Sequence, residues 1–167
     1  MRITKRNIDS AAQLSQIISA LAVVITVIYL TRQIQDNTKA LENQGHYNAL
    51  SVAQAPIVMM VDNSDLARII EKGYINPDSL VSVDQLRFYD HQFLSFNGWE
   101  YLYYANQSKS IPKSLWIGAD GYFSELIYTK PGLIKFWEVY KHAFAEPFKT
   151  YVENIYEKSY SLNSNNQ

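Results

Sequence analysis

The sequence predicts an all-α protein in which an N-terminal transmembrane helix continues into a small bundle of about five further helices. Three observations support this fold class. Residues 10–31 contain no Asp, Glu, Lys, Arg or His. Farther along the chain, apolar residues recur at intervals of three and four, which is the spacing of a helix with one buried face. No window alternates apolar and polar residues for long enough to indicate a half-buried strand.

The uncharged stretch at residues 10–31 is the predicted transmembrane helix. Its 22 residues, at about 1.5 Å of rise each, span roughly 33 Å, which matches a hydrocarbon core of about 30 Å. Arg2, Lys5 and Arg6 precede it, whereas Arg32 and Lys39 follow it. The basic bias toward the N-terminal side predicts a single-pass protein of the bacterial inner membrane, with the N-terminus cytoplasmic and the C-terminal domain outside.

Two other interpretations of this stretch stay open. Its strongly apolar part, residues 17–30, is short enough for the core helix of a soluble bundle. A cleaved signal peptide would also begin with basic and then apolar residues, but no cleavage site of small residues follows. An uncleaved signal anchor therefore fits the sequence better than a cleaved one.

Small residues recur at helical spacing along one side of the predicted transmembrane helix. They are Ala11, Ser15, Ser19, Ala22 and Thr26. Such residues let two helices approach closely, and hydroxyl groups can bond across the contact. They form a candidate helix–helix face for a homo-oligomer, and the alternative is that small residues are simply common in membrane helices.

The chain has four predicted parts: a basic leader (1–9), the transmembrane helix (10–31), a helical domain (32–160) and a disordered tail (161–167). Within the domain, Pro56 is expected to kink a helix or to start a new one. Gly73 is expected to end a helix in a left-handed conformation, and Ser82 with Gln85 to form a capping box. The expected helices are Tyr47–Val61, Asp65–Lys72, Ser82–Gln107, Pro112–Tyr128, Leu133–Phe144 and Pro147–Tyr160.

The helix expected at 82–107 carries the clearest inward-facing stripe. Its members are Leu86, Tyr89, Phe93, Phe96, Glu100 and Tyr103. The chain holds 13 Tyr, 7 Phe and 3 Trp. In a small helical domain, so many aromatic side chains are expected to form the core rather than a ligand-binding cage.

Glu100 is the titratable residue of most interest, because it falls on this apolar stripe. With Tyr103 and Tyr104 it forms a candidate buried polar site. A carboxylate there needs a partner or a raised pKa. One interpretation is a general acid or base; the favoured one is a structural carboxylate bonded to a Tyr hydroxyl or to an Arg such as Arg68 or Arg87.

Composition excludes several function classes. The net charge is −1, so no basic footprint for nucleic acid exists. The chain has no Cys, which excludes disulfides and thiol nucleophiles. His46, His91 and His142 show no metal-ligand spacing, and no phosphate-binding loop or nucleophile motif is present. The sequence therefore predicts no catalytic residue, no metal and no cofactor.

Several segments together resemble an uncharacterised family of small bacterial proteins. These segments are Leu30–Thr38, Asp65–Ala67, Lys72–Gly73, Glu100–Tyr104, Pro131–Gly132 and Phe136–Trp137. The resemblance implies one N-terminal membrane helix followed by an all-helical domain, and it implies no activity.

The sequence as a whole predicts a membrane-anchored interaction or sensory module without catalysis, bound to the lipid bilayer and self-associating, with Trp137 as a further residue of interest. Two alternatives stay open. One is a membrane-acting effector of a stress or phage-defence system. The other is an envelope enzyme that uses Glu100 with His91 or His142 as acid and base.

Overall fold

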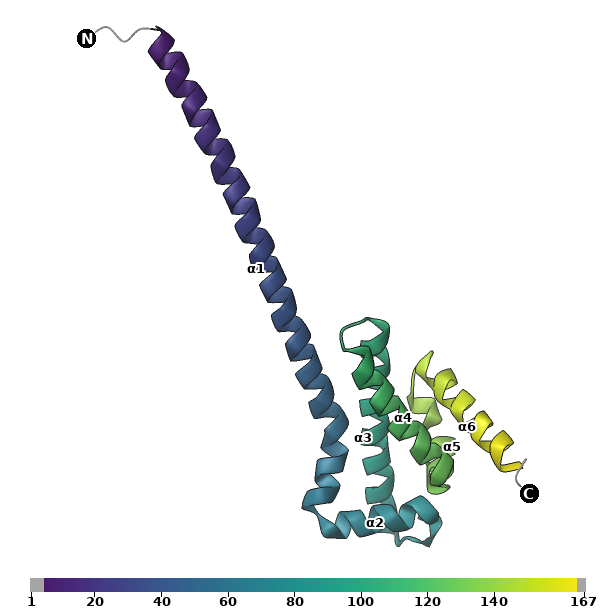
Figure 1. Cartoon of the computed structure of the whole chain (residues 1–167). Coiled ribbons are helices and arrows are strands. Elements are labelled where there is room, and N and C mark those ends of the chain that lie inside the picture. Colours follow the sequence, from purple (N-terminus) through teal and green to yellow (C-terminus); the bar gives the residue numbers. More distant parts are fainter. Residues whose placement is uncertain (1–4, 165–167) are drawn as a thin grey trace. The chain divides into compact units, whose positions relative to one another are not determined.

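The computed structural model describes the backbone of residues 5–164 and the side chains of residues 12–159. Over that range the protein is all-α, with six α-helices, two short 3₁₀-helices and no strand (Figure 1). The elements are α1 (Lys5–Asp62), α2 (Ser64–Ile75), η1 (Pro77–Ser79), α3 (Ser82–Gln107), α4 (Lys113–Thr129), α5 (Gly132–Tyr140), η2 (Lys141–Ala143) and α6 (Phe148–Ser164). A long N-terminal helix followed by five more in the described range confirms the predicted all-α class.

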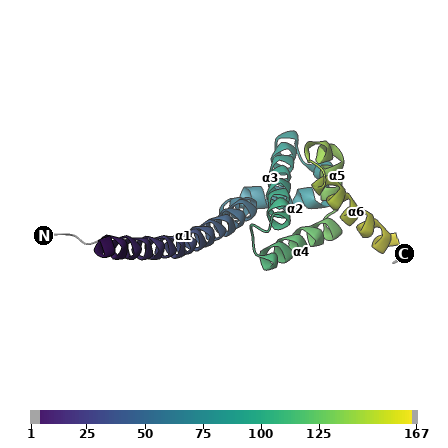
Figure 2. The same cartoon turned by 90° about the horizontal axis from the view of Figure 1, so that it is seen from above.

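The chain divides into two compact units, the first ending at Asn43 and the second beginning at Gln44. The first unit holds the N-terminal part of α1. The second holds the end of α1 and every later helix, and we call it the helical domain. Within the domain α3 contacts α2, α4 and α5, while α6 packs on α4. In Figure 2, α5 lies between α3 and α6, and α4 runs along one side of them.

Aromatic side chains form the core of the helical domain. Phe96 on α3 lies at its centre, with ring centroids 4.9 Å from Phe136 and 5.6 Å from Trp137, both on α5. Trp99 stacks on Phe123 of α4 at 5.0 Å. Each of these side chains is at most 7% exposed. The expected use of the aromatic residues as core thus accounts for the packing of α3 against α4 and α5.

The inward face of α3 differs at its first turn from the predicted stripe. Leu86 is 56% exposed, so its predicted inward position is wrong. Phe88 is fully buried instead and packs edge-on against Tyr74 of α2. The buried face continues through Gln92 and Phe96, which lie four and eight residues farther along and therefore on the same side of the helix.

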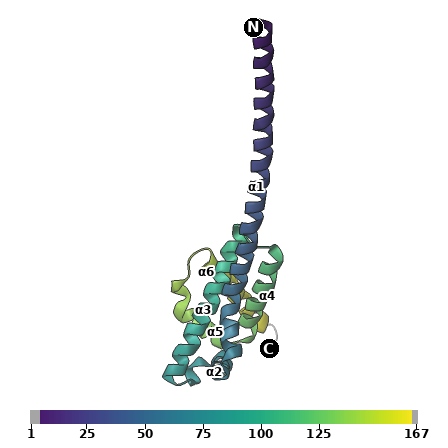
Figure 3. The same cartoon turned by 90° about the vertical axis from the view of Figure 1, so that its left-hand side faces the viewer.

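Helix α1 runs without interruption through Pro56 to Asp62, so Pro56 does not start a new helix. A proline has no N–H, and the carbonyl of Val52 therefore loses its helical partner. Gly98 of α3 lies against this carbonyl: a Cβ built on Gly98 would be 3.3 Å from the Val52 oxygen. His91 hydrogen-bonds the carbonyl oxygen of Pro56 at 2.9 Å. Figure 3 shows this end of α1 running beside α3.

Two predicted features of helix ends, a capping box and a glycine C-cap, are wrong. Ser82 and Gln85 form no capping box: Val81 precedes the helix without a side-chain cap, and the Gln85 amide donates to the Pro77 carbonyl at 3.3 Å. Gly73 does not end α2, which continues to Ile75, and no described glycine has a positive φ.

Gly73 is needed inside α2 because of what packs on it. A Cβ at Gly73 would lie 2.2 Å from the Phe88 ring, and a Cβ at Gly132 would lie 1.9 Å from the Gly73 carbonyl oxygen. Two glycines therefore allow the backbones of α2 and α5 to touch. This contact fixes where α5 begins, and through it the position of Trp137.

We predict that Gly132→Ala lowers the free energy of unfolding of the full-length chain by about 1–3 kcal/mol, the cost of overpacking. Gly121→Ala in α4 is the matched control, because a Cβ there meets nothing within 4 Å. The control should stabilise the chain by about 0.5–1 kcal/mol, since alanine favours a helix over glycine. Urea denaturation measures both, and a Gly132→Ala variant as stable as the parent would contradict the contact.

Candidate functional site

Glu100, Tyr103 and Tyr104 do not converge on one polar site. The half-buried Glu100 carboxylate accepts a hydrogen bond from the backbone N–H of Ala145 at 3.3 Å. One turn later, the Tyr104 hydroxyl donates to the carbonyl of Glu146 at 3.1 Å. Tyr103 is buried in the aromatic core. Glu100 and Tyr104 thus tie α3 to the segment that precedes α6.

Arg68 and Arg87, the predicted arginine partners of Glu100, bind another carboxylate. Arg87 pairs with Asp65 at 2.8 Å, and Arg68 pairs with the same carboxylate. Hydrogen bonds from Arg87 and Arg68 lower the pKa of Asp65. These exposed pairs link α2 to the start of α3 and leave Glu100 with the Ala145 amide.

His91 is a buried titratable group of the domain, 6% exposed. Its Nε2 lies 2.9 Å from the Pro56 carbonyl oxygen, and its Nδ1 faces the Gln92 amide at 3.3 Å. Burial lowers the pKa of His91, against the opposing effect of the Pro56 hydrogen bond. A neutral ring with its proton on Nε2 satisfies both contacts, because Nε2 then donates to Pro56 and Nδ1 accepts from Gln92.

The space beside His91 is too small for a substrate. It measures about 10 Å³ and is lined by Pro56, Tyr74 and Ser95 among others, which is room for about one water molecule. Glu100 is not among its lining residues. His142, the other candidate, is exposed in η2. The pairing of Glu100 with a histidine that acid–base catalysis would need is therefore not formed.

The candidate helix–helix face lies on the first unit. Ser15, Ser19, Ala22 and Thr26 are all exposed, and Ala11 lies in α1 outside the range of described side chains. The Thr26 hydroxyl donates to the Ala22 carbonyl at 2.8 Å, within its own helix. This donor is therefore satisfied by the backbone of its own helix.

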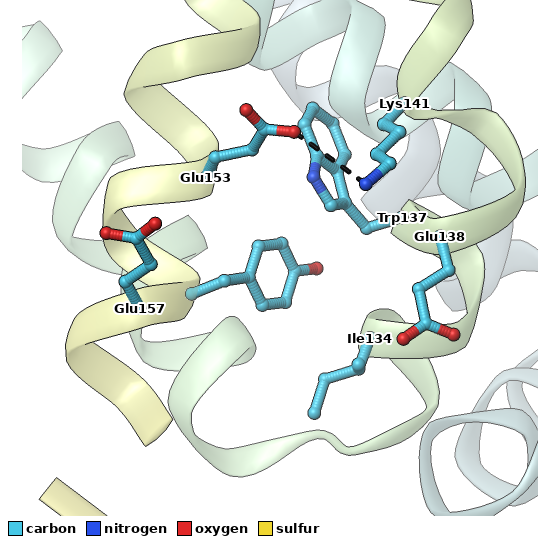
Figure 4. A pocket seen from close by; sticks show the side chains of 7 residues that line it. Ile134, Trp137, Glu138, Lys141, Glu153 and Glu157 are labelled. Atoms are coloured by element: carbon cyan, nitrogen blue, oxygen red, sulfur yellow. Dashed lines mark ion pairs between the residues drawn. The ribbon is translucent and has the colours of Figure 1, made fainter. Parts of the chain in front are cut away.

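The packing of α5 against α6 forms a hollow of about 370 Å³ that the sequence did not predict. Figure 4 shows its side chains. Its charged residues are Glu138, Lys141, Glu153 and Glu157, and its apolar wall is Ile134, Trp137 and Tyr156. Lys141 and Glu153 reach toward each other across it, with Nζ and Oε1 3.9 Å apart.

Trp137 connects this hollow to the core. The residue is 4% exposed, and its ring stacks with Phe144 at 5.3 Å and Tyr156 at 6.0 Å. Its indole Nε1 is buried and has no hydrogen-bond partner among the described residues. Trp99 Nε1 shares this property deep in the core, but only Trp137 lines the hollow.

The sequence holds a weak signal for these charged residues. Glu153 and Glu157 are four apart on one helix, and Glu138 and Lys141 are three apart near the end of the preceding one. Each pair therefore shares a helix face. Only the packing of α5 on α6 shows that the two faces enclose a common space.

In the part of the chain that the structure describes, no three His, Asp or Glu side chains lie close enough together to coordinate a metal ion. Comparison of the chain with protein-family models, curated proteins and solved structures finds no match. The family resemblance noted in the sequence therefore stays a prediction, and function has to be argued from geometry.

We predict that His91 makes stability depend on pH between about 5.5 and 7. The unfolded chain takes up a proton near the ordinary pKa of about 6.5, whereas the buried ring takes it up only at lower pH. The free energy of unfolding should fall on acidification by at most about 1.4 kcal/mol per pH unit. The pKa values of Asp65 and Glu146 are lowered from 3.8 and 4.5. These two groups therefore change the free energy of unfolding only below this pH window.

Urea denaturation at several pH values tests this. His91→Gln, which has no titrating ring, should flatten the dependence between pH 5.5 and 7. The exposed His142→Gln is the matched control and should keep the slope of the parent chain. An unchanged slope in His91→Gln would show that His91 is not the group responsible.

We predict a structural role for Glu100. Glu100→Ala should lower the free energy of unfolding by about 1 kcal/mol, the net value of a typical hydrogen bond. Glu100→Gln should retain most of it, because the amide oxygen can accept from Ala145 N–H. Glu125→Ala removes an exposed carboxylate of α4 as a control. A cellular phenotype lost in Glu100→Gln at an unchanged melting temperature would instead support a chemical role.

Proposed function

We propose that this protein is a membrane-anchored helical module for interaction or sensing, without catalysis. The observation that carries the proposal is the exposure of the apolar stretch in α1. The most apolar 18-residue window of this helix has a mean hydropathy of 2.1, and none of its residues is buried. Val23 and Ile25, for example, are 63% and 66% exposed.

This exposure supports a lipid environment over the alternative of a soluble core helix. A core helix buries its apolar face against other elements of its own chain. In α1 the large apolar side chains from Leu14 to Leu30 are between 49% and 66% exposed on every side of the helix. A helix that is apolar all round suits a lipid bilayer, which removes about 20 residues from water at once.

The proposed topology is a single pass through a bacterial inner membrane, with the N-terminus cytoplasmic and the helical domain outside. It rests on the basic residues Arg2, Lys5 and Arg6 before the apolar stretch. The small residues Ser15, Ser19 and Ala22 are exposed and suit pairing of two anchors into a homo-oligomer.

The helical domain offers a surface for a protein partner. A groove of about 260 Å³ runs between the end of α1 and α4, with Leu50, Ile57, Leu115 and Phe123 in its walls. Nearby on α1, Val61 is 78% exposed. Contiguous apolar surface of this kind is typical of interaction sites. It favours an interaction module over a domain that acts alone.

A membrane-acting effector is the second candidate, favoured by the exposed small-residue face of α1. If anchors must pair to perturb the bilayer, growth arrest on overexpression should vanish when Ser15 and Ser19 are both changed to Leu. Arrest that survives this change would exclude pairing through that face. An envelope enzyme based on Glu100 loses support, because the carboxylate is bound to the Ala145 amide.

The anchor is tested by membrane fractionation of the full chain, fused at its C-terminus to a reporter active only outside the cytoplasm or to one active only inside. We predict a carbonate-resistant membrane fraction with the outside reporter active. Changing both Val24 and Val27 to Asp should release the protein, because each acidic residue costs about 2.5–3.5 kcal/mol at the centre of a membrane helix.

Ser15→Leu with Ser19→Leu is the matched control, since it alters the same helix and keeps it apolar. An inside reporter active in the membrane fraction would reverse the topology. A fully soluble parent chain would overturn the proposal.

A further inference from the structure

We infer that the hollow between α5 and α6 binds a small ammonium compound that also carries an oxygen acceptor, such as an amino alcohol. This inference rests on the proposed function, because it names the class of ligand that the helical domain would bind as a sensory module. Three features of the hollow lead to it: its charge, its unpartnered donor and its size.

The charge of the hollow selects a cation. Three carboxylates line it, from Glu138, Glu153 and Glu157, against the single ammonium group of Lys141. Lys141 is paired with Glu153 at 3.9 Å, longer than a direct hydrogen bond. No ion pair within the described range occupies Glu138 or Glu157. Two carboxylates on opposite walls are thus available to a ligand cation.

The unpartnered indole of Trp137 selects an oxygen. Its Nε1–H can only donate, and a buried donor without a partner costs about 1–3 kcal/mol. The nitrogen lies on the edge of the ring that faces α6 and the space between the labelled side chains (Figure 4). Because Phe144 and Tyr156 stack with the ring, cation–π binding is not what the indole offers. A ligand oxygen would satisfy the donor.

The size of the hollow suits a small molecule. Its volume of about 370 Å³ falls at the lower end of the range of roughly 300–1,000 Å³ for ligand pockets. An amino alcohol places its ammonium group near the carboxylates and its oxygen near the indole N–H. A diamine matches the carboxylates only, and a neutral alcohol matches the indole only.

The test uses the full chain in detergent micelles and the ¹H–¹⁵N signals of its three indole groups. Trp137→Phe identifies the Trp137 signal. Four probes form two matched pairs: ethanolamine against propylamine, which lacks the oxygen, and choline against 3,3-dimethylbutan-1-ol, which lacks the charge. We expect ethanolamine or choline to shift the Trp137 signal saturably, more tightly than its partner probe, with Trp99 unmoved.

Variants that remove charges of the hollow distinguish specific binding at this site from nonspecific binding. Glu138→Gln with Glu157→Gln should weaken binding about threefold to tenfold, as two partly exposed ion pairs allow. Glu71→Gln with Glu125→Gln, both exposed and outside the hollow, should leave it unchanged. Lys141→Gln should strengthen binding, because Glu153 is then released to the ligand.

Several results would overturn the inference. They are the absence of any saturable shift, binding in which neither ethanolamine nor choline is tighter than its partner probe, or weaker binding in Lys141→Gln, which would indicate a carboxylate ligand. A Trp137 shift in nanodiscs containing phosphatidylethanolamine, without added solute, would support the inference and identify a lipid headgroup as the source. A Trp137 shift seen only with the free solute would support the inference and identify a soluble amino alcohol as the ligand.

The outcome of the binding test is independent of the outcome of the membrane fractionation. A chain that fractionates with the membrane but binds no amino alcohol loses this inference alone. A soluble chain that binds one loses the anchor and keeps the site.

Discussion

The packing around Phe96 holds the helical domain together. This ring lies within 6.4 Å of five other rings: Trp99 on its own helix, Phe123 on α4, Phe136 and Trp137 on α5, and Phe144 before α6. Of the helices that border the proposed ligand hollow, α5 is fixed to α3 by these contacts, and α6 by Phe148, whose ring packs on Trp99 at 5.4 Å. Trp137 belongs to this core and to the wall of the hollow at once, so the geometry of the hollow is a property of the core.

Local sequence signals were sufficient for much of the fold. The long helix α3 occupies the predicted residues 82–107, and the break at residues 130–131 separates α4 from α5 as expected. The errors have a common cause. Pro56, Gly73 and Gln85 each carry a strong local preference, and a contact from another helix overrides it in each case. A single sequence contains the preference but not the contact.

The same limit applies to the candidate sites. The apolar stripe around Glu100 predicts a buried polar site, and the structure gives the Glu100 carboxylate the backbone N–H of Ala145, 45 residues away. The carboxylates of the hollow look like ordinary exposed charges on two separate helices. Their common function depends on how α5 and α6 are placed, which the core determines and which no motif records.

The contact between α1 and α3 also limits how the sequence can evolve. Proline at 56 leaves the Val52 carbonyl without its helical donor, and glycine at 98 allows α3 to approach it. His91 hydrogen-bonds the carbonyl oxygen of Pro56 itself. Any other residue at 56 would restore the N–H, and the Val52 carbonyl would regain its helical hydrogen bond. The close approach of a glycine at 98 to that carbonyl would then no longer be favoured. Residues 56, 91 and 98 should therefore change together in related chains, and such covariation would indicate that those chains keep the contact between α1 and α3.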